Sequence, residues 1–146
     1  LTELQKVQTN YRIKVLPVIL TRKEEVAPTL SGIVPTVDAL FLTGSSIVGA
    51  VVPAVADLAG KGKVPTITSL SDVVNKGALF GVCANPYRNG RLSGEKAASV
   101  LRGASPSSIP IEADLRTDLI LNMKTVRAGG FQIPHAFMKR VTRVVE

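Results

Sequence analysis

The chain has 146 residues, of which 45% are hydrophobic and only 4% aromatic, with no Trp. This length predicts one domain with a core of ordinary size, and a core of Val, Ala, Leu and Ile is typical of a parallel sheet covered by helices. The single Cys83 excludes an internal disulfide framework and a thiolate cluster for metal, and no apolar run reaches the roughly 18 residues that span a bilayer.

The net charge is +7, and the whole excess lies in the second part of the chain. Residues 1–60 hold five Lys or Arg against five Asp or Glu, whereas residues 61–146 hold thirteen against six. These basic residues are spread singly, apart from Lys139-Arg140, and no aromatic residues interleave with them for base stacking. The pattern favours a solvated surface, so we predict no nucleic-acid partner.

The first residues predict a helix followed by a strand. The chain begins at Leu1 without an initiator Met or a signal segment, so we expect a processed or excised piece whose targeting signal cannot be read. Helical spacing of apolar residues predicts the end of an amphipathic helix over Leu1–Asn10. The β-branched stretch Arg12–Leu20 predicts a strand that ends at Pro17 or lies at a sheet edge.

The next helix is expected to begin with a capping box. Thr21 is predicted as its N-cap, with Glu24 reaching back to the first turn. The helix would present apolar residues on one face as far as Ile33. Pro28 is expected to kink it, because a proline deletes one backbone hydrogen bond.

Strands and helices then alternate, which predicts βαβ units and a parallel sheet. We expect strands over Val37–Leu42, Val64–Thr68 and Ala78–Ala84, a helix over Ile47–Leu58 capped by Ser46, and a helical turn over Val73–Lys76 stopped by Gly77.

In the last part of the chain, strands and helices no longer alternate regularly. We predict a loop over Asn85–Gly90, a helix from there to Leu101 that Gly103 ends, and a Ser/Pro linker over Ala104–Ser108. We then predict a short strand over Ile109–Ala113 and a strand over Leu119–Leu121. The last predicted elements are a helix capped by Asn122 and ended by Gly129-Gly130, a short helix opened by Pro134, and a closing segment over Val141–Val145.

No catalytic template is satisfied strongly. Gly44-Ser45-Ser46 lacks the Gly-x-Ser-x-Gly spacing of a nucleophile elbow, and His135 is the only imidazole. A small hydrolase that uses Ser45 or Ser46 with His135 is therefore a weak alternative. We predict no catalytic residue, no metal site and no cofactor, and we interpret Cys83 as a small buried hydrophobe.

Small polar turns follow the predicted strands at their carboxyl ends, where open α/β sheets bind ligands. The predicted ligand-binding residues are Gly44, Ser45, Ser46, Ser69, Asp72, Asn85 and Tyr87. Hydroxyl, amide, phenol and carboxylate groups at converging strand ends suit the orientation of a small polar molecule. The alternative is that they are only turn and cap residues, since Ser, Asn and Asp are favoured there in any case.

The order of these segments resembles a known family. VDALFLTGSS, then KVPTITSLSDVVNKGALFGVCANPYRNGRLSGEKAASVLRG, then LILNMKTVRAGGFQIP, is similar to the tryptophan/tyrosine-type substrate-binding proteins of ABC transporters. The resemblance covers roughly residues 35–134 and rests on the order and spacing of its landmarks. Pro86 and Arg88 depart from the commoner pattern around Tyr87, so the ligand need not be an aromatic amino acid.

The resemblance implies a type I periplasmic-binding-protein fold, an α/β fold with a parallel sheet flanked by helices, of which this chain is the later part. Residues 1–77 would form most of the second of two lobes. Residues 78–146 would contain a crossover strand and segments that pack with or return to the first lobe, which is largely absent. The helix 88–101 would then be uncovered, so we expect the missing N-terminal lobe, or a second copy of the chain, to cover it.

The function that the resemblance implies is solute binding. The protein would bind a small organic molecule, such as an amino acid or a related compound, between two lobes in the periplasm or cell envelope. It would deliver that molecule to an ABC permease in the membrane. The alternative is a ligand-sensing domain of a regulatory or receptor protein, because the same fold serves repressors and receptor sensors.

Overall fold

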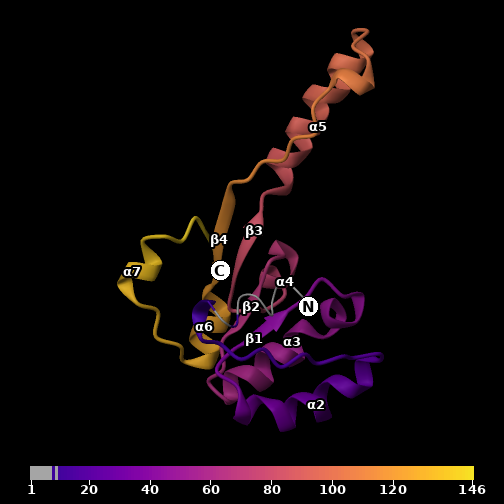
Figure 1. The fold of residues 1–146 in the computed structure, drawn as a ribbon. Helices are drawn as coiled ribbons and strands as arrows, with labels where there is room; N and C mark the ends of the chain where they lie inside the picture. Colours follow the sequence, from indigo (N-terminus) through magenta and orange to yellow (C-terminus); the bar gives the residue numbers. More distant parts are fainter. Residues whose placement is uncertain (1–7, 9) are drawn as a thin grey trace.

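The computed structural model describes residues 8 and 10–146. A sheet with helices on both sides forms the body, and one long helix projects from it (Figure 1). The helix expected over Leu1–Asn10 lies almost wholly outside the described residues. No helix within the described part of the chain is both long and apolar enough to cross a membrane.

The five strands of the sheet lie side by side in chain order. They are β1 (Leu40–Leu42), β2 (Thr66–Thr68), β3 (Phe80–Ala84), β4 (Thr117–Asn122) and β5 (Arg143–Val145). The pairs β1–β2, β2–β3 and β4–β5 are parallel, whereas β3–β4 is antiparallel, which differs from the wholly parallel sheet we expected. The reason is topological: the chain leaves the sheet at the end of β3 and returns at the same end, so β4 must run the opposite way.

The two faces of the sheet are covered to different extents. The helices are α2 (Val26–Ile33), α3 (Ser46–Lys61), α4 (Ser71–Asn75), α5 (Pro86–Leu101), α6 (Met123–Gly129) and α7 (His135–Met138). On one face α3 packs on Leu42 and α4 packs on Cys83. On the other, Phe137 of α7 meets Phe80 edge to face with ring centroids 5.2 Å apart, while Phe41 remains exposed.

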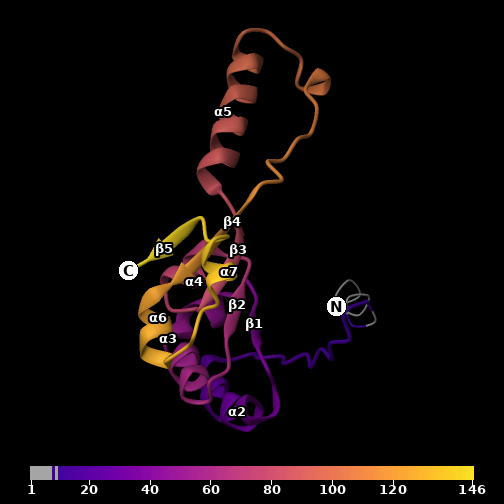
Figure 2. The same cartoon turned by 90° about the vertical axis from the view of Figure 1, so that its left-hand side faces the viewer.

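A projecting hairpin stands away from this body. It consists of α5 and the returning segment 102–116, and both views show it extending beyond the sheet (Figures 1 and 2). None of the residues of α5 is buried. Gly103, with φ of 100°, ends this helix as expected. The body therefore contains the core, and the hairpin depends on other contacts for cover.

The strand expected over Arg12–Leu20 is wrong. Residues 12–20 are largely exposed and form no ladder in the described part of the chain, and Ile19 is 84% exposed. β1 is the edge strand of the sheet, and no described segment pairs with its free edge. High β-propensity does not make a strand where no neighbour is present to complete the ladder.

The carboxylate that caps the start of α2 is shifted by one residue from its expected position. A 3-10 turn over Lys23–Glu25 precedes α2, and the carboxylate of Glu25, rather than Glu24, accepts the backbone amides of Thr21 and Arg22 at 3.0 and 3.3 Å. Pro28 is the third residue of α2, so the hydrogen bond that we expected it to delete does not exist there.

The other corrections concern the projecting hairpin. Asn85–Gly90 is not a loop: Asn85 caps α5, accepting the amide of Arg88 at 3.2 Å, and Pro86 occupies the first helical position, where its missing N–H costs nothing. Ile109–Ala113 forms no strand, because it lies along the helix α5 and no described strand pairs with it. It is held instead by Lys96, which donates to the carbonyl of Pro110 at 2.6 Å.

Candidate functional site

The first two polar turns meet at the carboxyl edge of the parallel strands. Leu42 at the end of β1 is level with Thr68 at the end of β2. A Cβ on Gly44 would lie 3.0 Å from Cδ1 of Leu70, so the turns that follow the two strands are in contact. Gly44 and Ser69 therefore lie close together at the carboxyl ends of β1 and β2, the edge at which open α/β sheets bind ligands.

Within these turns, the residues differ in how far they are engaged. Ser45, rather than Ser46, is the N-cap of α3, and its Oγ accepts the amide of Ile47 at 3.2 Å. Ser46, Ser69 and Asp72 are exposed, with Asp72 in the first turn of α4. Their side chains are therefore accessible to a solute.

The third turn lies farther out. β3 continues three residues beyond Gly81, the residue level with Thr68, so β3 ends about 10 Å beyond the end of β2, and Asn85 and Tyr87 follow after that point. Tyr87 lies in the first turn of α5 and is 78% exposed. The predicted site residues thus form two groups: Gly44, Ser45, Ser46, Ser69 and Asp72 on the body, and Asn85 and Tyr87 where the hairpin begins.

A network of charged residues joins the two chain segments at the base of the hairpin. Nη2 of Arg88 lies 3.1 Å from Oδ1 of Asp118, and Nδ2 of Asn85 donates to Oδ2 of Asp118 at 2.7 Å. Nη2 of Arg88 also donates to the carbonyl of Arg116 at 3.1 Å. Nε of Arg88 lies 3.0 Å from Oδ2 of Asp114, but its N–H is not aligned with that oxygen. We call Asn85, Arg88, Asp114, Arg116 and Asp118 the neck network.

The sequence places Arg88 in the polar turn after the predicted strand Ala78–Ala84, but we did not include it among the predicted ligand-binding residues and treated Asp114 and Asp118 as scattered carboxylates. The one local signal is the alternation of charges at positions 114, 116 and 118. Asp118 points to the same face of the sheet as Cys83, its register partner on β3. Nothing in the chain near Arg88 indicates that its partners follow 26 to 30 residues later.

The strongest electrostatic perturbation in the network is at Asp114. Arg116 donates to it through Nη2 at 2.7 Å, through Nε at 2.8 Å and through its backbone amide at 3.0 Å. These hydrogen bonds, the side-chain ones first, hold the pKa of Asp114 well below its usual value of 3.8. Because the folded chain binds this proton only at lower pH than the unfolded chain does, the contribution is complete above pH 3.8 and is lost as pH falls through the folded pKa.

An NMR titration of the carboxyl carbons tests this arrangement. We expect Asp114 to be still ionised at pH 3.8, and Arg116→Gln to raise the pKa of Asp114 toward that value. Arg91→Gln, which removes an exposed pair with Glu95, should leave it unchanged. A midpoint at or above pH 3.8 in the unsubstituted chain would contradict the prediction.

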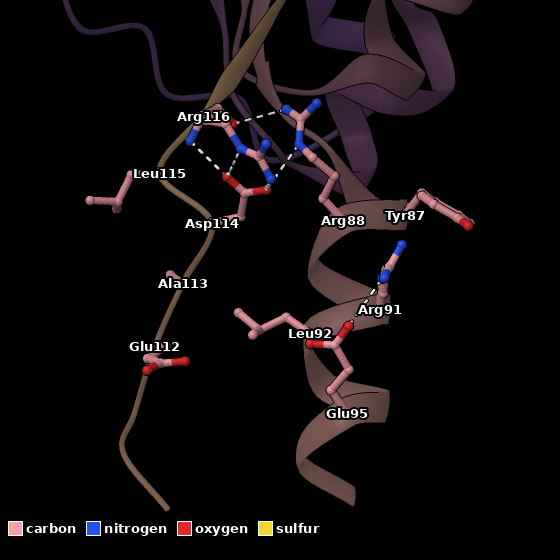
Figure 3. Close-up of a pocket in the computed structure, with 10 residues that line it drawn as sticks. All are labelled: Tyr87, Arg88, Arg91, Leu92, Glu95, Glu112, Ala113, Asp114, Leu115 and Arg116. Carbon is pink, nitrogen blue, oxygen red and sulfur yellow. Dashed lines mark hydrogen bonds and ion pairs between the residues drawn. The ribbon is translucent and has the colours of Figure 1, made fainter. Parts of the chain in front are cut away.

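A groove runs along the hairpin between α5 and the returning segment (Figure 3). Its volume is about 720 Å³, and Leu92 of α5 points across it toward the returning segment. Three arginines and three carboxylates line the groove, and each of these six side chains belongs to an ion pair. Arg88 and Arg116 pair with Asp114, Arg91 pairs with Glu95, and Glu112 pairs with Lys96. The groove therefore offers no free charge to a solute.

The described residues contain no group of three or more His, Cys, Asp or Glu that could hold a metal ion. Cys83 is fully buried, as we expected, and burial raises the pKa of its thiol. His135 opens α7, and among the described residues no hydrogen bond joins its side chain to Ser45 or Ser46. The described residues therefore show no hydrogen-bonded pair of His135 with either serine of the weak hydrolase alternative.

Comparison with known proteins gives a consistent picture. Residues 1–145 match the model of a family described as "ABC transporter substrate binding protein". A "Tyrosine-binding protein" of Clostridioides difficile (strain R20291) is 31% identical over 114 residues, which are 77% of this chain and 33% of that protein. The chain thus spans about a third of the length of this curated relative.

Solved structures resemble the chain over nearly its whole length. A substrate-binding protein with adhesive properties from Clostridium difficile, in its ligand-free, open structure, has a TM-score of 0.82 and 28% identity, covering 99% of this chain and 48% of that one. An ABC domain from Streptococcus pneumonia in complex with L-Trp has a TM-score of 0.77 and 22% identity, covering 99% of this chain and 50% of that one. At 22% identity the second likeness shows the fold alone.

Proposed function

Because this chain belongs to the ABC transporter substrate-binding protein family, we propose that it is part of the solute-binding component of an ABC transporter. The solute is an amino acid or a related small organic compound, held between two lobes and delivered to a membrane permease. The relatives whose names mention tyrosine and L-Trp support this ligand class. Proteins of this family act outside the cytoplasm, and we propose the periplasm or cell envelope for this one.

The two groups of site residues support a two-lobe arrangement. We assign residues 1–77 to most of one lobe, and residues 78–146 to the crossover and the segments that return to or pack with the other lobe. Within this second part, β3, β4 and β5 extend the sheet of the body, and α5 with residues 102–116 reaches toward the other lobe. Solute would then contact Gly44, Ser45, Ser46, Ser69 and Asp72 on the body and Asn85 and Tyr87 at the base of the hairpin.

The exposure of the hairpin is the observation that carries this proposal. Leu101 is 89% exposed, and Ile111 and Leu115 are also exposed, although apolar side chains of this size are seldom left in water together. A covering surface is therefore needed. We propose the N-terminal lobe of the same protein, since the solved relatives are about twice as long as this chain; a second copy of the chain is the alternative.

We also propose that the protein performs no catalysis. The hydroxyl of Ser45 is engaged in capping α3, and within the described residues no hydrogen bond joins the exposed Ser46 or Ser69 to a histidine or a carboxylate. Hydrogen-bonding groups without a nucleophile–base pair suit reversible capture and release.

Thermal stabilisation by solute tests the proposal. In protein expressed from the complete coding sequence, an amino acid present at 100 times its Kd should stabilise the fold by about 2.7 kcal/mol and raise Tm by several degrees. Ser69→Ala should weaken binding about fivefold to tenfold through loss of one hydrogen bond, with Tm of the free protein unchanged. Ser93→Ala is the matched control, because Ser93 is an exposed serine on α5 whose hydroxyl donates, among the described residues, only to the carbonyl of Asn89.

Absence of any shift across the amino acids and related small acids would overturn solute binding. Uptake of labelled solute by cells, compared with cells that lack the gene, separates transport from sensing. Intact uptake together with a lost transcriptional response would favour the ligand-sensing alternative.

A further inference from the structure

Two backbone passages connect the body to the hairpin. The chain leaves the sheet after Ala84 and re-enters it at Thr117, and these two residues form the last register pair of β3 and β4. Beyond this pair no ladder holds the segments together. The direction in which α5 projects from the body is therefore decided by the side chains that follow, and these are the neck network.

Arg88 is the centre of this network. Its guanidinium reaches Asp114, Asp118 and the carbonyl of Arg116, all on the returning passage, although the side chain itself stands on α5. Asn85 adds a second bridge, because its Oδ1 caps α5 while its Nδ2 donates to Asp118. The first turn of α5 is thus tied at several points to the returning passage and to Asp118 of β4. Figure 3 shows the contacts of Arg88 with Asp114 and Arg116.

The contacts of Arg88 differ in kind from the other ion pairs on the same helix. The side chain of Arg88 is 25% exposed and that of Asp114 is 11% exposed, whereas the Arg91–Glu95 pair lies in solvent within one helix. Exposed pairs within a helix contribute little, whereas removing Arg88 takes away the cation that Asp114 and Asp118 share, and leaves Asp114 with Arg116 and Asp118 with Asn85. Loss of Arg88 should therefore alter the geometry of the neck, while loss of Arg91 should not.

We propose that Arg88 is a positioning residue that holds the hairpin at a set angle to the sheet body and thereby favours the lobe arrangement that binds solute. This inference rests on the proposed two-lobe function. If only part of the population has the binding-competent angle, the apparent affinity falls by that fraction. Arg88 acts here through the orientation of α5, without contact with the solute.

The angle can be measured without any ligand. Spin labels at Ala50→Cys on α3 and Arg102→Cys at the end of α5 report the distance between body and hairpin, and both sites are exposed. The buried Cys83 should stay unlabelled. In protein from the complete coding sequence, Arg88→Met is expected to make the distance distribution about twofold wider, and Asp118→Asn should widen it in the same way.

Arg91→Met, one turn away on the same helix, is the matched control and should leave the distribution unchanged. Arg88→Lys, which keeps the charge but offers fewer contacts, should give an intermediate width and serves if Arg88→Met does not fold. With L-tyrosine as the probe, Arg88→Met should bind about threefold to tenfold more weakly.

The outcomes separate the two proposals. Unchanged distance distributions in Arg88→Met and Arg88→Lys would overturn the positioning role, even if solute binding is intact. Failure of every amino acid to bind, with the widened distributions still observed, would overturn the proposed solute and leave the role of Arg88 in setting the angle.

Discussion

Asn122→Ala is expected to lower the free energy of unfolding by about 3 kcal/mol. The side chain is 2% exposed and performs two tasks at once. Its Oδ1 accepts the amide of Thr125 at 3.1 Å and so caps α6, and its Nδ2 donates to the carbonyl of Val74 at 2.8 Å. Alanine removes the cap, which costs about 1 kcal/mol, and leaves a buried carbonyl without its donor, which costs about 2 kcal/mol more.

Chemical denaturation with a constant m value measures this loss. Asn75→Ala is the control, because Asn75 is exposed and, among the described residues, its Oδ1 accepts only from Arg143 at 3.3 Å. We expect a change below about 0.5 kcal/mol. Asn122→Asp keeps an oxygen for the cap but loses the donor to Val74, so it should also be destabilised. A loss below 1 kcal/mol in Asn122→Ala would show that water replaces both contacts.

Gly81→Ala is expected to cost about 2 to 3 kcal/mol for the opposite reason, since it adds an atom where none fits. A Cβ at this position would lie 2.8 Å from Sγ of Cys83, 2.8 Å from Cγ2 of Val74 and 2.9 Å from the carbonyl oxygen of Thr68. The side chains could turn aside, but the carbonyl belongs to the neighbouring strand. β2 and β3 would have to separate, at the point where the candidate site is built on them.

Thermal unfolding compared with that of Gly94→Ala tests this reasoning. Gly94 lies inside α5, with no described atom within 4 Å of its added Cβ, so alanine there should raise helix stability by about 1 kcal/mol. Val74→Ala combined with Gly81→Ala should recover only part of the loss, because the clash with Thr68 remains. Equal Tm values for Gly81→Ala and the unsubstituted chain would refute the overpacking argument.

The caps and stops were the most predictable part of the fold. Asn122, Gly103 and Pro134 occupy the positions expected of them, because an N-cap or a helix stop depends on groups only a few residues away. Errors of one residue, as at Ser45 and Glu25, come from the same local competition between neighbouring polar side chains. The contact between the first two polar turns could also be predicted, because the carboxyl ends of neighbouring parallel strands lie at the same edge of the sheet. The role of these turns in binding a solute remains a prediction.

The sequence by itself determined the α/β class, the order of most of its elements and helix starts such as those at Asn122 and Pro134, because these depend on periodicity and on bonds between near neighbours. Only the tertiary structure decided three other features: the antiparallel direction of β4, the absence of a strand over residues 12–20, and the partners of Arg88. Strand direction follows from where the chain leaves and re-enters the sheet, and a ladder needs a neighbour. The ion pair between Arg88 and Asp118, which are 30 residues apart, forms only when β3 and β4 are paired. The residues around Arg88 therefore could not indicate the neck network.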